Sequence, residues 1–457
     1  MAGARLGLRP RRREGRCCRC AGRDAREHQA HHDHVEDACR RCAYVLHRRA
    51  TELTMTMHRR PLLRRGAMRA AFGFTLVELL ISMTIGLVLM AALGIMMNAF
   101  DKSKRQSATT SDLAQNSGYL SYDLDRQLRS IGSGLFQNQA LSFGCPLDVA
   151  RNGAPILPRQ SAFPAPFQNV PGAVAAMPIV VYAGLGFDAK FGNGPSDVIQ
   201  IMTTSAGMSE APQEVVTGTV QVNAFNMNNT LGLRGGDLLM LTELSRRCLI
   251  TQVAPNFVGS AAPGVPLDGP YYAAAVGTNN LVSYGVSSPL SVTNLGNING
   301  NQPHFQLIGI NDKRQLVAYD MLQMNNIPNA DLPVPLADNV IDFRVRFGVA
   351  PAGNGVITSW VNPSAAPYNA AGLTATPALG ADIVAVSISM LVRGDRIERD
   401  KEYVSPGTFT MFSALPAAMQ TTIKLPEAEQ LRHYRLIELT VPVRNAILTA
   451  PARPVPP

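Results

Sequence analysis

The chain beyond residue 73 is poor in the residues that catalysis uses most often. It keeps only two histidines, His304 and His433. It has no Gly-x-Ser-x-Gly elbow, no His-Glu-x-x-His pair and no phosphate-binding Gly-Lys-Ser/Thr loop. Acidic and asparagine-rich turns are present, but they lack the ligand spacing of an EF-hand. We therefore expect no enzyme, no cofactor and no metal site.

Positive charge is absent from Phe74 to Phe100, where Glu78 is the only charged residue. About 20 apolar residues are enough to cross a bilayer. A charged side chain near its centre costs roughly 2.5 to 3.5 kcal/mol on insertion scales, so such residues usually have a function. Cleavage between Gly73 and Phe74 would create an α-amino group one helical turn before Glu78. That amine could offset the carboxylate, within one chain or between neighbours.

The run Gly-Phe-Thr-Leu-Val-Glu-Leu-Leu at residues 73–80, preceded by arginines at 64, 65 and 69, resembles the processing site of type IV prepilins and pseudopilins. The resemblance implies that a prepilin peptidase, a membrane aspartyl enzyme, cuts after Gly73. It also implies that the new amine of Phe74 is methylated and that Glu78 acts as the assembly glutamate.

Two other interpretations of this segment explain less. A secretory signal has an apolar core of about 7 to 15 residues, which is too short to match residues 74–100. A plain membrane anchor fits the length but gives no reason for Glu78 or for the glycine before Phe74.

The segment before residue 74 differs in composition from the rest. It holds 18 arginines, no lysine and 7 acidic residues, whereas the later chain holds 24 basic and 26 acidic residues. A nucleic-acid partner is therefore not expected for the exported part. We interpret residues 1–67 as a disordered extension or as sequence upstream of the true start, with Met57 or Met68 as initiator. Residues 68–73 would be the leader. This extension also contains five cysteines, a residue type that binds zinc, but their spacing is not that of a known zinc finger.

The hydrophobic pattern predicts an α+β protein. One long helix is expected over residues 74–135, with a transmembrane segment at 74–100 and an amphipathic half marked by a leucine stripe from Leu113 to Leu135. Gly132 and Gly134 are expected to end it. This helix should pack on a β-rich globular domain at residues 136–457, which has long loops at about 151–178, 254–304 and 350–380.

Alternating apolar residues predict the strands of that domain. In residues 340–347, Ile341, Phe343, Val345 and Phe347 are expected on one face. In residues 383–392 the even-numbered side chains are expected to point inward. Residues 311–314 are expected to form a hairpin turn. Further strands are expected at 179–182, 198–203, 237–241, 249–253, 305–310, 316–321 and 436–443.

Only Cys145 and Cys248 remain after the expected cleavage. An even pair in a chain sent across a membrane predicts a disulfide in an oxidising compartment. Two buried free thiols are the alternative.

Beyond the processing site, the order and spacing of several short runs resemble the large minor pilins of the PilW type. These runs are residues 124–132 followed by Cys145, residues 236–241 followed by Cys248, and residues 345–348, 389–393 and 434–445.

The resemblance implies a structural subunit that helps initiate assembly of a type IV pilus and lies at or near its tip. Its partners would be the major pilin, other minor pilins and a tip adhesin. It would sit in the bacterial inner membrane as a single-pass protein with a periplasmic C-terminal domain, and then in the pilus on the cell surface. The alternative is a pseudopilin of a type II secretion system. Twitching motility, cell adhesion and DNA uptake are not distinguished by the sequence.

Overall fold

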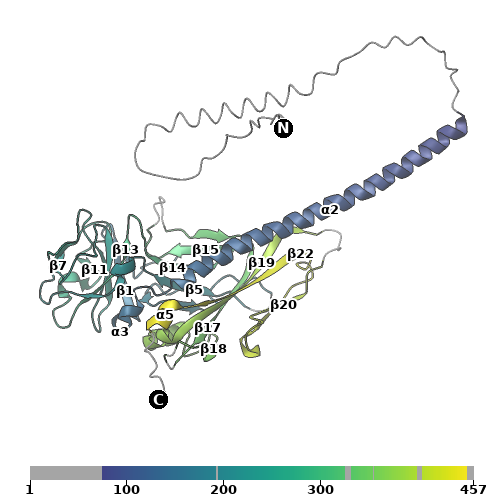
Figure 1. Ribbon diagram of the computed structural model, residues 1–457. Coiled ribbons are helices and arrows are strands. Elements are labelled where there is room, and N and C mark those ends of the chain that lie inside the picture. The colour runs from purple at the N-terminus through teal and green to yellow at the C-terminus, as the bar shows by residue number, and fades with distance from the viewer. Residues whose placement is uncertain are drawn as a thin grey trace, which may run out of the picture. The chain divides into compact units, whose positions relative to one another are not determined.

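The computed structural model describes residues 75–191, 194–324, 331–351, 353, 355–398 and 404–449. It contains a long apolar N-terminal helix and a C-terminal domain rich in strands, which confirms the α+β prediction (Figure 1). The chain divides into two units at the boundary between Gly86 and Leu87. The predicted extension at 1–67, the leader at 68–73, Gly73 and Phe74 lie outside the described residues.

Helix α2 runs without interruption from Leu76 to Arg129. From its start to Phe100 every side chain is exposed. Further along, one stripe at spacings of three and four residues is buried, as an amphipathic helix requires. The stripe consists of Thr109, Leu113, Ser117, Leu120, Leu124 and Leu128.

The helix ends at Arg129 and not at the predicted Leu135. Turns follow, in which Gly132 and Gly134 both adopt positive φ, at 71° and 70°. The backbone N–H of Gly132 donates to the carbonyl of Met202 at 2.8 Å. The chain therefore leaves the helix to bind a strand, while Leu135 stays buried although it is no longer helical.

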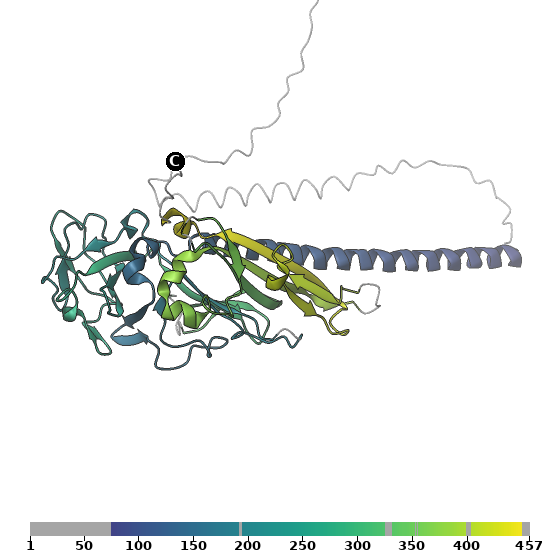
Figure 2. The same ribbon diagram turned by 90° about the horizontal axis from the view of Figure 1, so that it is seen from below.

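Two sheets, together with part of a third, form the main core with this stripe. The five-stranded sheet has the order β16-β15-β14-β5-β4, and the four-stranded sheet has the order β18-β17-β19-β22. Figure 2 shows β19 and β22 running beside α2. The bounds are β4 Ile179–Tyr182, β5 Val198–Thr203, β14 His304–Ile310, β15 Leu316–Asp320, β16 Val334–Ala337, β17 Val340–Val349, β18 Ser359–Val361, β19 Ile383–Ile397 and β22 Arg432–Pro442.

A third sheet is mixed and has seven strands, with β2-β1-β9-β8-β13-β6 in order and β3 beside β1. Part of it carries a second hydrophobic core. The bounds are β1 Cys145–Arg151, β2 Ala154–Leu157, β3 Ala175–Ala176, β6 Gln213–Glu214, β8 Asp237–Thr242, β9 Cys248–Gln252 and β13 Ser291–Asn297.

Three two-stranded sheets and several short helices complete the domain. The sheets are β7 Ala224–Asn226 with β10 Gly264–Pro266, β11 Ala275–Val276 with β12 Asn279–Asn280, and β20 Thr408–Met411 with β21 Thr421–Lys424. The helices are η1 Phe136–Asn138, α3 Gln139–Ser142, η2 Gly207–Glu210, η3 Leu281–Ser283, α4 Ala370–Ala375, η4 Pro377–Asp382, η5 Ala417–Met419 and α5 Arg444–Thr449.

The predicted strands are all present, with bounds shifted by a few residues at most. One predicted face is wrong. The register of β17 against β19 shifts between Val340 and Asp342, so Ile341 sits at a bulge. Phe343 packs in the main core, whereas Ile341 packs in a separate cluster with Leu391. A bulge inserts one unpaired residue and so reverses the alternation on one side of it.

Candidate functional site

Thr75 and Glu78 form a reciprocal cap at the start of α2. The backbone N–H and the hydroxyl of Thr75 lie 3.3 and 3.2 Å from Glu78 Oε2, and the N–H of Glu78 lies 3.3 Å from Thr75 Oγ1. This is the arrangement of a capping box, in which two side chains satisfy backbone donors of the first turn. All contacts of the carboxylate in this box use Oε2, which leaves Oε1 able to accept from another donor.

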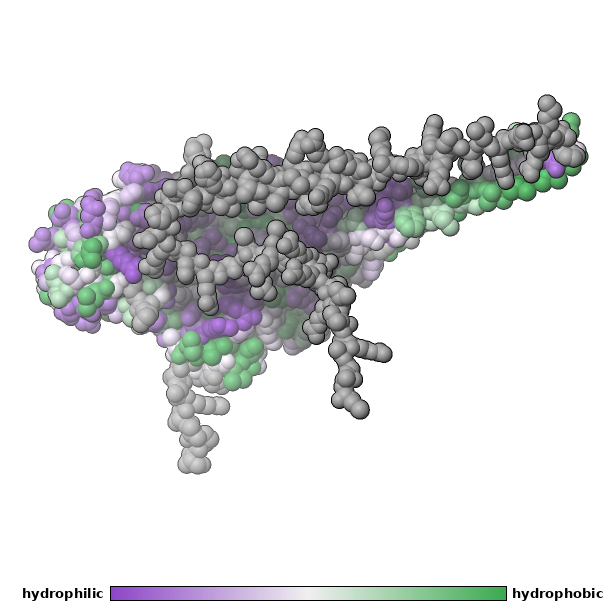
Figure 3. All heavy atoms as spheres, turned by 45° about the horizontal axis from the view of Figure 1, so that its top comes forward, coloured by the Kyte–Doolittle hydropathy of each residue, from purple (hydrophilic) through white to green (hydrophobic). Residues whose placement is uncertain are grey.

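The first half of α2 has the composition of a membrane span. It is long and apolar enough to cross a membrane, and none of its most apolar stretch is buried in the structure. Its few hydroxyls bond to the helix itself, since Ser82 Oγ donates to the carbonyl of Glu78 at 2.7 Å and Thr84 Oγ1 to that of Ile81 at 2.9 Å. Polar groups satisfied inside one segment are what a lipid environment requires. Figure 3 shows the hydrophobic surface along this part of the helix.

The second half of α2 is part of the folded domain. Leu120, Leu124 and Leu128 are each 1% exposed. Near the start of the buried stripe, Thr109 passes so close to β19 that a Cβ on Gly394 would meet Thr109 Cγ2 at 3.1 Å. A side chain at this position would therefore require Thr109 to shift by a few tenths of an ångström.

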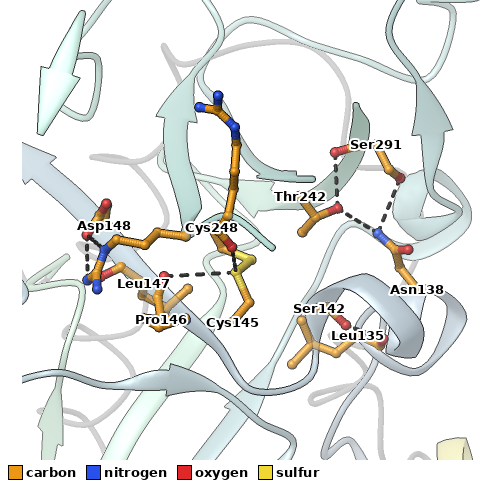
Figure 4. Close-up of a disulfide and its surroundings, with 12 residues drawn as sticks. Leu135, Asn138, Ser142, Cys145, Pro146, Leu147, Asp148, Thr242, Cys248 and Ser291 are labelled. Atoms are coloured by element: carbon orange, nitrogen blue, oxygen red, sulfur yellow. Dashed lines mark hydrogen bonds and ion pairs between the residues drawn. A yellow bond between two sulfur atoms is a disulfide. The ribbon is translucent and has the colours of Figure 1, made fainter. Parts of the chain in front are cut away.

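The end of α2 is tied to three elements. Ser133 Oγ donates to Glu210 Oε2 at 2.8 Å. Asn445 of α5 donates from Nδ2 to the carbonyl of Ile131 at 2.9 Å. In Figure 4, Asn138 points toward Thr242 and Ser291, and its Nδ2 lies 2.8 Å from Thr242 Oγ1. These bonds connect the segment that follows the helix to η2, α5 and β8.

The predicted disulfide between Cys145 and Cys248 is confirmed. Figure 4 shows that it joins the beginnings of β1 and β9, which are parallel neighbours in the seven-stranded sheet. The two cysteines are 103 positions apart in sequence, and their Cα atoms are 5.7 Å apart. The bond therefore closes a long loop at a point where the sheet already brings the chain together.

A buried polar network lies next to the disulfide and was not predicted from the sequence. Asp148 is 2% exposed. It accepts from Arg247 Nε and Asn279 Nδ2, each at 2.7 Å. The hydroxyl of Tyr284 donates to the carbonyl of Arg247 at 2.6 Å. Burial, together with the charge of Asp148, raises the pKa of Tyr284 to about 12. The network holds the segments around η3 against β1.

A second unpredicted group of buried charges lies on β17. Arg344 Nε is 2.9 Å from Asp342 Oδ1, and Arg344 Nη1 is 3.7 Å from Asp197 Oδ1. Burial raises the pKa of both carboxyls, and Arg344 opposes that shift. Arg346 donates from Nη2 to Thr421 Oγ1 at 2.8 Å. The strand face that alternation alone would assign to solvent is therefore covered by the β20–β21 hairpin and by the segment before β5.

His304 and His433 lie in different surroundings. Burial and the charge of Arg126 lower the pKa of His304, which begins β14. His433 in β22 lies 3.4 Å from Glu398 Oε1. Among the described residues, no group of three or more His, Cys, Asp or Glu side chains is placed to hold a metal ion.

Comparison with known families gives two matches. Residues 68–94 match the prokaryotic N-terminal methylation motif, and residues 312–445 match the family of type IV pilus-assembly protein W. Neither a curated protein nor a solved structure matches the chain. The first match covers the processing site and the beginning of α2, and the second runs from the β14–β15 turn into α5. The two matches therefore support a type IV pilus-related pilin that carries a prepilin motif and resembles the PilW type.

Proposed function

We propose that this chain is a minor pilin, a structural subunit without catalytic activity that helps initiate assembly of a type IV pilus and lies at or near its tip. The observation that carries the proposal is the division of α2. Its first half exposes apolar side chains on all sides and has one acid at its start, while its second half buries one stripe of side chains in a folded domain. The match to assembly protein W supports a pilus over a secretion pseudopilin.

Assembly would begin with cleavage between Gly73 and Phe74 and methylation of the new amine at Phe74. Glu78 uses Oε2 for the cap with Thr75. Its other oxygen can accept from the ammonium of a neighbouring subunit. Pairing the two charges offsets the cost of an acid in hydrocarbon, and the apolar surfaces of neighbouring helices pack together. A subunit in lipid can thereby exchange lipid contacts for contacts in a fibre.

Before assembly, the first half of α2 would hold the subunit in the bacterial inner membrane, with the C-terminal domain in the periplasm. The Cys145–Cys248 disulfide supports this orientation, because such bonds persist in oxidising compartments. The pilus on the cell surface would be the final location. A prepilin peptidase, the major pilin, other minor pilins and a tip adhesin are the proposed partners.

Three variants test this function. Gly73→Leu should leave the precursor uncut, and a Phe74 N-terminus found in that variant by mass spectrometry would contradict the cleavage site. Glu78→Ala should be processed yet give few pili. Glu78→Gln is the matched control, because its amide oxygen can still cap Thr75 but carries no charge. If Glu78→Gln restores piliation, capping and not charge pairing is the role of this residue.

Deletion of the gene separates the pilus from secretion. We expect surface fibres to disappear while protein secretion continues. Intact fibres with lost secretion would contradict the proposal and favour a type II secretion pseudopilin.

A further inference from the structure

A polar cavity of about 870 Å³ lies beside the beginning of β8 and the end of β13. Its walls come mainly from two segments, residues 229–237, which lead into β8, and residues 294–301, which end β13 and form the turn after it. The volume is within the range of small-molecule sites, about 300 to 1,000 Å³. Processing and membrane anchoring use residues 73–100 and leave this cavity without a role.

Asp237 ties the two walls of the cavity together. It is 5% exposed. It accepts from Asn294 Nδ2 at 2.9 Å, from Asn297 Nδ2 at 2.7 Å and from the backbone N–H of Arg234 at 2.8 Å. The amide of Asn297 continues the network, because its Oδ1 accepts from the backbone N–H of Asn299 at 2.9 Å. The walls are therefore held in place before any ligand arrives, which lowers the entropic cost of binding.

Three side chains in these walls keep their hydrogen-bonding groups available. Arg234, Asn299 and Asn301 are exposed. In the part of the chain that the structure describes, their side chains have no hydrogen-bond or ion-pair partner. A side-chain amide offers two donor hydrogens and an acceptor oxygen, and a guanidinium offers five donor hydrogens. The walls thus present both donors and acceptors to a ligand.

The charge and the apolar surface of the cavity restrict the class of ligand. Among the described residues that line it, two carry a charge, Arg234 and Asp237, and these are of opposite sign. None of these residues is aromatic, so a nucleic-acid base would lack a stacking partner. Leu231 lines the cavity and is 68% exposed. A neutral ligand with many hydroxyl groups and an apolar face fits this surface, since each hydroxyl both donates and accepts.

We propose that this cavity binds a neutral saccharide made of hexose or N-acetylhexosamine units. The saccharide hydroxyls bond to the amides of Asn299 and Asn301 and to the guanidinium of Arg234, and a C–H face of one ring packs on Leu231. Two sources share this chemistry, the glycan strands of the cell wall and the polysaccharides outside the cell. The inference goes beyond the proposed function and does not require the first half of α2 to lie in lipid.

Saturation-transfer NMR on the full chain tests the proposal and separates the two sources. The protein is kept in a zwitterionic detergent, because a detergent with a sugar headgroup would compete for the cavity. N-acetylglucosamine oligomers represent the cell-wall strands, neutral hexose oligomers represent extracellular polysaccharides, and uronic acid oligomers test the charge. We expect binding of the first or the second set, and the set that binds more tightly identifies the source.

Three variants locate the binding. A Cβ added at Gly300 meets no atom within 4 Å, and its φ is not in the left-handed region. Gly300→Val should therefore fold normally and weaken binding about tenfold or more, because its side chain takes space from the ligand. Asn301→Ala removes one amide and should weaken binding about fivefold. Asn223→Ala is the matched control, because Asn223 is exposed and does not line the cavity. It should bind like the unmodified chain.

Four results would overturn the proposal. They are no binding of either neutral set, tighter binding of the uronic acid oligomers, unchanged binding in Gly300→Val, and an equal loss of binding in Asn223→Ala and Asn301→Ala. Urea unfolding of each variant shows whether a loss of binding comes from a loss of folding. Because all three changes are at exposed positions, we expect the unfolding midpoints to stay close to that of the unmodified chain.

Discussion

Replacement of Leu124 by alanine tests whether the second half of α2 is part of the domain core. Leu124 is 1% exposed and lies in the main cluster with Leu120 and Leu128. Truncation of such a leucine removes buried methyl groups and leaves a cavity, which costs about 2 to 5 kcal/mol. Because sheet residues from several elements line this cluster, we expect little collapse around the gap and a loss in the upper half of that range.

The matched control is Leu93→Ala, the same substitution in the same helix at a side chain that is 63% exposed. It should change the free energy of unfolding of the domain by no more than about 0.5 kcal/mol. Urea unfolding of the detergent-solubilised chain, followed by the fluorescence of Trp360 in β18, measures both variants. A change below about 1 kcal/mol in Leu124→Ala would refute the assignment of α2 to the core. Equal losses in the two variants would refute the division of the helix.

Three further changes test other parts of the structure. Thiol labelling of the denatured chain without reductant should find neither Cys145 nor Cys248 free, and replacement of both by serine should cost about 4 to 5 kcal/mol in the chain-entropy model. Burial raises the pKa of Glu429, but Tyr434 and Arg393 outweigh burial and leave it below its ordinary value. A lowered pKa stabilises the folded state at pH values above the ordinary pKa of 4.5, and this stabilisation is lost as the pH falls. In urea unfolding, Glu429→Gln should therefore lower the free energy of unfolding by a large amount at pH 7 and by a small amount at pH 3. Gly394→Val should destabilise the domain by about 1 to 3 kcal/mol through overpacking, and Thr109→Ala in the same chain should recover part of that loss; simple additivity of the two changes would contradict the close approach of α2 to β19.

Local patterns predicted most of the strands because their signal lies in the residues themselves. In β14, β15 and β19, apolar residues alternate or run together, and the register follows from burial of one face. β13 shows the limit of this reasoning. Its residues, Ser-Val-Thr-Asn-Leu-Gly-Asn, fall in a stretch that we expected to be loop, yet they pair with β8 and β6 inside the seven-stranded sheet. The pairing comes from neighbours distant in sequence and not from the propensity of the strand.

The buried charges of β17 show the same limit at single residues. Alternation places Arg344 and Arg346 on the face opposite Phe343, and a sheet with one wet face would leave them in water. The β20–β21 hairpin and the segment before β5 cover that face and supply acceptors for the two guanidinium groups. The pattern of residues 340–349 by itself does not predict that residues 194–197 and 408–424 cover this face of the strand.

The amino-acid sequence by itself determined the processing motif, the membrane segment with Glu78, the stripe of α2 and the cysteine pair, because each depends on the type and spacing of nearby residues or on a count. The tertiary structure alone decided where the helix ends and which face of β17 is covered. Those features depend on contacts between residues as far as 75 to 314 positions apart in the sequence, and such contacts leave no periodic signal in either segment.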